Sequence, residues 1–217
     1  MEPRFVTLEG LDGSGKSTQL RFASRWLSRR GLTHRVTQEP GGTPLGDSIR
    51  SIFLDLEEEW STVDGIVEAL LIFASRRQHL LEVIEPTLAA GTHVLCDRFT
   101  DSTLAYQGHG RGVPESVLLR IDELATGSRM PDFTLLFDLP AATARDRGHS
   151  PSRKDRVGGV DRLDAEQIEF YEQVRQGYLG LAAASPERFR IIDASGSVDA
   201  TQRRVERALT EIFGVGA

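Results

Sequence analysis

The 217-residue sequence contains no asparagine, one cysteine and two lysines, and each shortage excludes something. Without asparagine, the chain cannot carry the Asn-Lys-x-Asp motif with which GTPases read guanine. A single cysteine, Cys96, cannot form an intrachain disulfide, which favours a cytosolic, reducing setting. No apolar run approaches the roughly 20 residues that span a bilayer, and the N-terminus lacks the apolar stretch of a secretory signal. We therefore expect neither a membrane segment nor a signal peptide, and a cytoplasmic location.

An excess of positive charge is also missing. The chain has 26 basic and 32 acidic residues, a net charge of −6, which argues against broad binding to nucleic acid or to a membrane surface. Its composition, 39% hydrophobic and 27% charged, is typical of a folded globular chain. Because no linker, repeat or low-complexity tract interrupts it, we expect one domain over residues 1–217. Nearly all of the basic residues are arginine, so the two lysines, Lys16 and Lys154, stand out.

Short apolar segments alternate with segments of helical periodicity along the chain. We expect strands at residues 4–9, 34–38, 92–96, 133–137 and 189–192, with helices between them. This alternation predicts an α/β fold in which helices cover both faces of a parallel sheet. Ligands of such sheets bind at the carboxyl ends of the strands, where Gly10, Asp97 and Asp138 fall. A long helical stretch after Ser61 should be perturbed at Pro86 and end at Gly91.

Residues 10–17, with the sequence GLDGSGKS, match the phosphate-loop pattern G-x-x-x-x-G-K-[ST] between a predicted strand and a predicted helix. Backbone N–H groups of such a loop surround a polyphosphate, the lysine reaches its β- and γ-phosphates, and the serine binds Mg²⁺. An ordinary glycine-rich turn is the alternative. We predict that ATP and Mg²⁺ are bound here by Gly10, Gly13, Ser14, Gly15, Lys16, Ser17 and Thr18. The Leu-Ser-Gly-Gly-Gln signature of ABC-type ATPases is absent, which leaves a small-molecule kinase.

Four further segments resemble the thymidylate (dTMP) kinase family. They are EPGGT at 39–43, DRF at 97–99, STLAYQG at 102–108 and DRL at 161–163, and the similarity is collinear from about Phe5 to Phe213. The resemblance implies the P-loop nucleoside-monophosphate-kinase fold with a five-stranded parallel sheet, phosphorylation of dTMP to dTDP with Mg-ATP, and a homodimer. Two alternatives stay open: a related deoxynucleotide or deoxynucleoside kinase with a shifted base preference, and a nucleotide-binding protein without activity.

The resemblance also implies how the acceptor's phosphate and sugar are bound. Arg98 and Arg50 would hold the phosphate, because a guanidinium offers a planar fork of donors. Asp12, inside the phosphate loop, would contact the sugar 3′-OH. Asp97 would contribute to the Mg²⁺ site or, alternatively, only pair with Arg98. Tyr106 would favour deoxyribose over ribose.

The acceptor's base would be read by Arg76, Thr103 and Gln107. Thr103 and Gln107 are four residues apart and share a face if that segment is helical. Pro40 lies in a turn that can hold a cis peptide bond. Many bacterial relatives place a phenylalanine four residues before the base-reading arginine, to stack on thymine. Here Ile72 occupies that position and Phe73 the next, so either the helix adjusts to let Phe73 stack, or Ile72 packs against the base and Phe73 belongs to the core.

Six basic residues lie between Arg145 and Arg162, in a polar stretch that contains Gly148, Gly158 and Gly159. A solvated basic loop is one interpretation. In kinases of this class, however, a mobile lid closes over ATP and stabilises phosphoryl charge. We expect such a lid at about residues 146–161, because residues 11–14 of the phosphate loop offer no cation. The predicted catalytic residues are Asp12, Lys16, Arg98, Arg153 and Arg156, while Arg145 and Arg162 would contact adenine or position the lid.

Overall fold

The computed structural model describes residues 2–54, 63–148 and 167–214. Five strands form one parallel sheet in the order β2-β3-β1-β4-β5. The strands are β1 (Phe5–Gly10), β2 (His34–Gln38), β3 (His93–Asp97), β4 (Phe133–Asp138) and β5 (Phe189–Asp193). The five-stranded parallel sheet expected from the sequence is confirmed, and each predicted strand end lies within one residue of the observed end.

The helices fill the connections between the strands. They are α1 (Lys16–Arg29), α2 (Pro44–Leu54), α3 (Gly65–His79), α4 (Glu85–Ala89), α5 (Thr100–Thr103), α6 (Glu115–Thr126), α7 (Ala141–Gly148), α9 (Ile168–Ala184) and α10 (Val198–Phe213). A π-helical segment (Leu80–Ile84) joins α3 to α4, and a second (Leu104–Gly110) follows α5. The perturbation expected near Pro86 is confirmed, because the helix widens just before this proline. Residues 146–148 of the predicted lid end α7, and its remaining residues lie outside the described chain.

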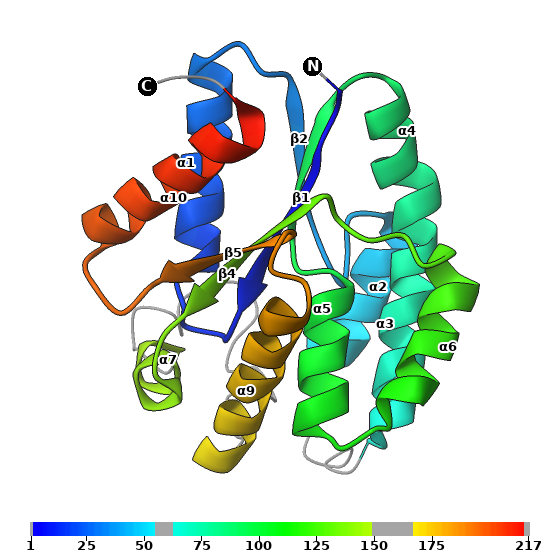
Figure 1. The fold of residues 1–217 in the computed structure, drawn as a ribbon. Coiled ribbons are helices and arrows are strands. Elements are labelled where there is room, and N and C mark those ends of the chain that lie inside the picture. The colour runs from blue at the N-terminus through cyan, green and yellow to red at the C-terminus, as the bar shows by residue number, and fades with distance from the viewer. Residues whose placement is uncertain (1, 55–62, 149–166, 215–217) are drawn as a thin grey trace.

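Helices cover both faces of the sheet, with α1 and α10 side by side on one of them (Figure 1). Side chains of these two helices, among them Leu27 and Leu209, pack against Leu95 and Leu135 of the sheet. Alternation along β3 turns its neighbours Val94 and Cys96 to the opposite face, where they pack with Leu80, Ile84 and Leu88. None of the helices in the described chain has the length and apolar character that crossing a membrane requires.

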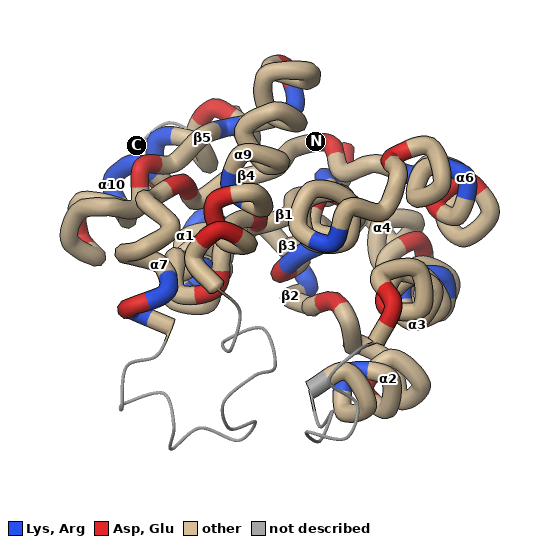
Figure 2. The backbone as a smooth tube through the Cα atoms, turned by 90° about the horizontal axis from the view of Figure 1, so that it is seen from below, with Lys and Arg blue, Asp and Glu red and all other residues tan. Residues whose placement is uncertain are grey.

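The strand register brings the carboxyl ends of the strands to one edge of the sheet. Gln38 lies beside Asp97, Gly10 beside Phe137 and Asp138 beside Asp193. The phosphate loop leaves β1 at this edge and enters α1. Seen from below, acidic and basic residues are interspersed along the helices (Figure 2). The carboxyl edge therefore gathers the segments that the sequence analysis singled out.

Candidate active site

The phosphate loop (residues 10–18) has a backbone that requires glycine. Gly10, Gly13 and Gly15 have φ angles of 134°, 83° and 92°, in the region that side chains disfavour. A Cβ atom on Gly13 would lie 2.0 Å from the carbonyl oxygen of Ala144, because α7 packs directly on the loop. Both the glycines of the loop and the packing of α7 against it therefore determine the conformation of the turn.

Lys16 is turned into the loop that precedes it. Its Nζ donates hydrogen bonds to the carbonyl oxygens of Gly10 and Leu11, both at 2.8 Å, and lies 4.0 Å from Asp12. The residue is 6% exposed. Burial, aided by the nearby charge of Arg98, lowers the pKa of Lys16 to about 8. A polyphosphate bound at this loop would offer the ammonium phosphate oxygens in place of backbone carbonyls.

A cavity of about 790 Å³, here called the loop cavity, lies over the phosphate loop. Its wall includes five of the predicted nucleotide-binding residues: Gly13, Gly15, Lys16, Ser17 and Thr18. Gly10 and Ser14 shape the loop beneath this wall. The cavity also contains Asp97, whose Oδ1 atom is buried without a hydrogen-bond partner.

Asp97 and Ser17 are suited to a magnesium ion. Both line the loop cavity, and both offer the hard oxygen ligands that Mg²⁺ prefers. The described residues contain no group of three or more His, Cys, Asp or Glu side chains placed to hold a metal. Mg²⁺ in kinases commonly binds through one or two protein oxygens together with substrate phosphates and water, so this pair fits it.

Arg147, near the end of α7, also lines the loop cavity. Its guanidinium donates to the carbonyl oxygens of Ala194 at 2.8 Å and Ser195 at 3.1 Å, in the turn after β5. Sequence reasoning counted Arg147 among the basic residues but assigned it no contact. Arg145, two positions earlier, does not line this cavity in the described chain. The predicted residues Arg153, Arg156 and Arg162 lie outside the described residues.

A second cavity of about 630 Å³, here called the inner cavity, adjoins the first. Asp12, Glu39, Arg50 and Arg98 line both cavities and therefore mark their junction. Of the ten residues predicted to bind the acceptor, all except Phe73 line the inner cavity. Its full lining is Asp12, Glu39, Pro40, Arg50, Phe53, Ile72, Arg76, Arg98, Ser102, Thr103, Tyr106 and Gln107.

Arg98 lies at the junction, where it has an unusual backbone conformation and several polar partners. Its φ angle is 73°, a conformation that costs a non-glycine residue about 1–3 kcal/mol and is typical of functional sites. The guanidinium pairs with Asp12 at 2.8 Å and donates to Ser102 at 2.9 Å and Tyr106 at 3.2 Å. Its ion pair is thus with Asp12 rather than with Asp97.

Arg50 approaches the same junction from α2. Its Nη1 atom donates to the carbonyl oxygen of Pro40 at 3.1 Å. The Glu39–Pro40 peptide bond is cis, as the sequence analysis expected for this turn. Two arginines therefore face the junction between the cavities, where an anionic group could be held.

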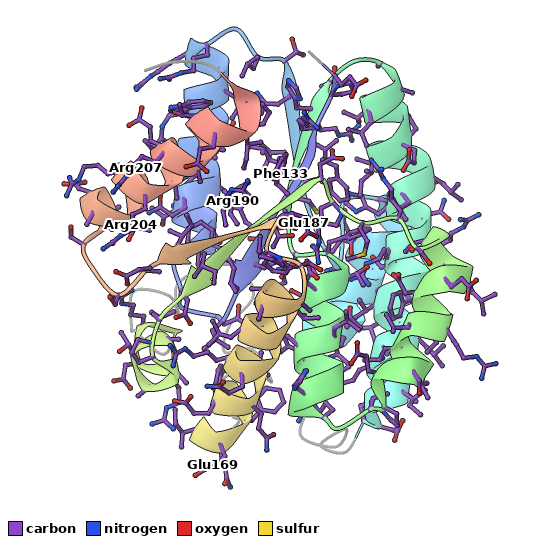
Figure 3. The ribbon with its side chains drawn as sticks, in the orientation of Figure 1. Phe133, Glu169, Glu187, Arg190, Arg204 and Arg207 are labelled. Atoms are coloured by element: carbon purple, nitrogen blue, oxygen red, sulfur yellow. The ribbon has the colours of Figure 1, made fainter. Side chains whose placement is uncertain are left out.

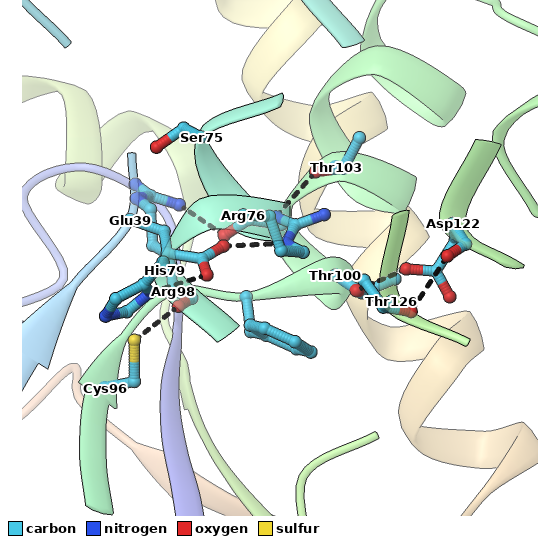
Figure 4. Close-up of polar contacts among 12 residues, drawn as sticks. Glu39, Ser75, Arg76, His79, Cys96, Arg98, Thr100, Thr103, Asp122 and Thr126 are labelled. Atoms are coloured by element: carbon cyan, nitrogen blue, oxygen red, sulfur yellow. Dashed lines mark hydrogen bonds and ion pairs between the residues drawn. The ribbon is translucent and has the colours of Figure 1, made fainter. Parts of the chain in front are cut away.

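Arg76 is buried and fixed by a network of charged and polar groups (Figure 4). Its Nε donates to Glu39 at 2.7 Å, and its Nη2 donates to Thr103 at 3.1 Å. The other oxygen of Glu39 lies 2.9 Å from His79 Nδ1, and Thr37 lies 2.6 Å from His79 Nε2. Nη1 of Arg76 alone is left without a hydrogen-bond partner. The network leaves one guanidinium nitrogen free for a ligand.

Gln107 also lines the inner cavity. Its Nε2 donates to Glu68 at 2.9 Å, and because a carboxylate only accepts, this bond fixes which end of the amide is which. Oε1 of Gln107 is buried without a partner. Thr103 and Gln107 do share the cavity, as predicted from their spacing, although the segment after Thr103 is π-helical.

Ile72 and Phe73 are adjacent on α3 but face different surroundings. Ile72 lines the inner cavity. Phe73 is 2% exposed and packs in the core with Leu104 and Leu118, with its ring centroid 4.8 Å from the guanidinium carbon of Arg76. Of the two arrangements considered from the sequence, the structure therefore has isoleucine against the cavity and phenylalanine in the core. The phenylalanine of the cavity wall is Phe53, which the sequence analysis missed.

Glu9, the residue before the phosphate loop, was also missed. Its buried carboxylate accepts hydrogen bonds from the backbone N–H of Phe99 at 2.7 Å, from the hydroxyl of Ser102 at 2.5 Å and from the hydroxyl of Tyr178 at 3.0 Å. Burial, aided by Asp101, raises the pKa of Glu9 to about 7. Because Ser102 also binds Arg98, Glu9 supports the residue at the junction of the two cavities.

The arginines of α10 lie away from these cavities. Arg190, Arg204 and Arg207 line the outer surface formed by β5 and α10 (Figure 3). Arg204 pairs with Asp193 at 2.7 Å and Arg190 with Glu211 at 3.3 Å. Arg207 is exposed on this surface and offers a site for control substitutions.

Three comparisons place this geometry among known proteins. The thymidylate kinase family model matches residues 8–205. A thymidylate kinase from Neisseria gonorrhoeae (strain NCCP11945) is 44% identical over 215 residues, which cover 99% of this chain and 100% of the relative. One from Geobacter sp. (strain M21) is 45% identical over 205 residues, 94% of this chain and 90% of the relative. The crystal structure of thymidylate kinase from Ehrlichia chaffeensis is similar with a TM-score of 0.73 and 30% identity, covering 99% of this chain and 100% of that one.

Proposed function

This chain belongs to the thymidylate kinase family and phosphorylates dTMP to dTDP, and we propose that its inner cavity binds dTMP while its loop cavity binds ATP. The cavities meet at Arg98 and Arg50, where the phosphate of dTMP would face the γ-phosphate of ATP.

One observation carries the choice of base. Arg76 and Gln107 both line the inner cavity, and Nη1 of Arg76 and Oε1 of Gln107 are buried without a hydrogen-bond partner. Thymine presents the complementary pair, a carbonyl acceptor at O4 beside an N–H donor at N3. Cytosine presents the reverse, an amino donor at N4 beside an acceptor at N3. A cytosine base would leave two buried groups unpaired, which is how a polar site rejects the wrong ligand.

The transfer itself needs positioning and positive charge more than proton removal. A phosphate oxygen of dTMP attacks the γ-phosphorus of ATP, the bond to the β-phosphate oxygen breaks, and ADP leaves. The attacking oxygen is already anionic, so no general base is required. Arg98 and Arg50 would orient the acceptor phosphate, and Lys16 would neutralise the β- and γ-phosphates of the donor. Asp12, which binds Arg98 at 2.8 Å, would contact the sugar 3′-OH.

Ser17 and Asp97 would hold Mg²⁺, and support for this comes from the buried Oδ1 atom of Asp97, which has no hydrogen-bond partner. The ion would supply charge neutralisation to the phosphates of ATP. On the adenine side, Arg147 and the carbonyl groups of Ala194 and Ser195 would line the donor nucleotide.

The second cation for the transferred phosphoryl group would come from Arg153 or Arg156, with Arg145 and Arg162 contacting adenine or positioning the lid. Support is indirect: residues 11–14 carry no basic side chain, so Lys16 is the loop's one cation. Alanine variants of Arg153 and Arg156 test this assignment. Loss of transition-state charge stabilisation lowers kcat more than it raises KM, and an unchanged kcat in both variants contradicts the proposal.

A coupled assay of ADP release separates a nucleotide kinase from a nucleoside kinase. With Mg-ATP, dTMP should be a good acceptor. Thymidine should be a poor one, because it lacks the phosphate that Arg98 and Arg50 would bind. Arg98→Ala should lower kcat/KM for dTMP by about 10²-fold or more. Arg207→Ala, on the outer surface of α10, is the matched control. Thymidine used as well as dTMP would contradict this assignment and favour the nucleoside kinase.

A homodimer is supported by an exposed apolar surface on α3 and α6. These helices lie side by side, with Arg77 of α3 donating to the carbonyl oxygen of Ala125 on α6 at 3.2 Å. Ile66, Val67 and Leu70 are exposed on α3, and Leu124 on α6 is 85% exposed. A second copy would bury them. Sedimentation equilibrium should give a dimer for the natural protein and a monomer for Leu70→Glu, and a natural monomer would contradict the proposal.

The proposed location is the cytoplasm. Support comes from Cys96, the one cysteine of the chain, which is buried and cannot form an intrachain disulfide.

A further inference from the structure

The wall of the inner cavity contains a phenylalanine, although the family's phenylalanine position is occupied by Ile72 in this chain. Phe53 lies on α2 and lines the cavity, and it is 7% exposed. The helix that the family pattern uses for this purpose, α3, presents Ile72 instead. Phe73 packs in a separate core cluster with Leu104 and Leu118. Among the residues that line the inner cavity, Phe53 therefore supplies the phenyl ring, from a different helix than expected.

The position of Phe53 along α2 places it away from the junction of the two cavities. Arg50 and Phe53 are three residues apart, so they share one face of the helix and are separated by about 4.5 Å along its axis. Arg50 lines both cavities, whereas Phe53 lines only the inner one. Arg76 and Gln107 likewise line the inner cavity alone, so Phe53 lies on the same side of the junction as the residues proposed to read the base.

Ile72 and Phe53 belong to one apolar cluster, which also includes Tyr106. The polar edge of a base bound here would meet Arg76 and Gln107, so its flat faces would meet this apolar wall. An isoleucine at position 72 is smaller and not planar, which leaves room for a ring supplied by another helix. An aromatic ring offers a base a matching flat surface that an aliphatic side chain lacks.

We propose that Phe53 packs its ring on the face of thymine and is the aromatic base-binding residue of this enzyme, with Ile72 completing the wall. The role rests on the proposed binding of dTMP in the inner cavity and adds to it a residue on α2. With an aromatic ring at position 53 instead of position 72, the stacking contact would be kept. It would then be provided by α2 rather than by α3.

Three variants test the assignment by steady-state kinetics. Phe53→Leu keeps an apolar side chain but removes the ring, and it should raise KM for dTMP about tenfold, the effect of losing one base-stacking contact. Its kcat and its KM for ATP should change less than about twofold, because the transferring groups lie elsewhere. Adding Ile72→Phe to Phe53→Leu should lower KM most of the way back to that of the natural enzyme. Ile52→Ala, at the exposed neighbouring residue of α2, is the matched control.

Several results would overturn the assignment. One is a KM for dTMP in Phe53→Leu within about twofold of the natural enzyme, and another is a double variant no better than Phe53→Leu. If Phe53→Leu does not fold, Ile72→Phe alone decides the question, since two rings competing for one space should raise KM, and a lowered KM would overturn the proposal. The natural enzyme in the same assay separates the two levels. If it does not phosphorylate dTMP, the proposed function fails, whereas activity on dTMP with a silent Phe53→Leu rejects only the role of Phe53.

Discussion

The inner cavity and the loop cavity differ in what holds their charged and polar side chains. In the inner cavity, carboxylates fix the groups that face the ligand: Glu39 binds Arg76 and Glu68 binds Gln107. In the loop cavity, Lys16 is bound to the carbonyl oxygens of its own loop, and Oδ1 of Asp97 has no hydrogen-bond partner.

This difference matches the two tasks. The acceptor side must distinguish one base from others, and discrimination requires donors and acceptors that hold their positions without the ligand. On the proposed donor side, phosphate oxygens would replace the carbonyl oxygens of Gly10 and Leu11 at Lys16, and Mg²⁺ would neutralise Asp97. We therefore expect preorganisation where the base is read, and rearrangement on ligand binding where the phosphoryl group is transferred.

The largest expected effect follows from removing the carboxylate that organises the inner cavity. Glu39→Gln leaves the buried charge of Arg76 without its partner, which typically costs about 3–5 kcal/mol of folding stability. Urea unfolding measures this loss. Glu211→Gln, which removes an exposed ion pair to Arg190, is the control and should cost about 0–1 kcal/mol. Equal small losses in both variants would mean that Glu39 does not organise the cavity.

A substitution in the loop cavity should lower the activity of the enzyme without weakening the binding of the acceptor. Lys16→Ala removes the cation that faces the β- and γ-phosphates, and kcat should fall by about 10²–10³-fold. Calorimetric titration should give a Kd for dTMP close to that of the natural protein, because Lys16 does not line the inner cavity. Arg207→Ala should leave both quantities unchanged. A large loss of dTMP affinity in Lys16→Ala would show that the two cavities are not independent.

Glu9 binds Ser102, which in turn binds Arg98 at the junction of the two cavities, and it should make stability depend on pH. Burial and Asp101 raise the pKa of Glu9 from 4.5 to about 7, so the folded protein holds an extra proton between these values. The free energy of unfolding should therefore fall as pH rises through this window, by on the order of 3 kcal/mol for this group. Urea unfolding at about pH 5 and about pH 8 checks the slope. Glu9→Gln should be less pH-dependent, and an unchanged slope would rule Glu9 out as its source.

The smallest expected effect concerns the choice of base. Gln107→Leu removes the free acceptor of the inner cavity, and kcat/KM for dTMP should fall by about 5–100-fold, which corresponds to one buried hydrogen bond. The ratio of kcat/KM for dTMP to that for dCMP should shrink as well. Gln176→Leu, at an exposed position of α9, controls for the loss of an amide. A fall in activity without a change in this ratio would limit Gln107 to a structural role.

Features that depend on neighbouring residues in the sequence were predictable. The phosphate loop is contiguous, and the strands follow from short apolar runs, so both were placed within a residue of where they lie. The cis peptide before Pro40 and the shared cavity of Thr103 and Gln107 also agree with expectation. Each of these follows from local pattern or from the family resemblance.

Features that depend on packing between helices could not be predicted. Ile72 and Phe73 differ by one step of about 100° on a helix, and only the packing of α3 against α6 decides which of them faces the cavity. Phe53 carried a signal, its spacing from Arg50, but nothing local indicated that this face of α2 meets α3. Glu9 and Arg147 acquire their contacts across long sequence separations. The roles of Arg153 and Arg156 stay predictions.

We propose that the inner cavity is fixed in advance to read thymine. The most direct test is kcat/KM of the natural enzyme for dTMP, dUMP, dCMP and dGMP at saturating Mg-ATP. We predict the highest value for dTMP and a value for dCMP lower by about 100-fold or more, because cytosine would leave the free groups of Arg76 and Gln107 unpaired. A higher kcat/KM for dCMP or dGMP than for dTMP would contradict the account.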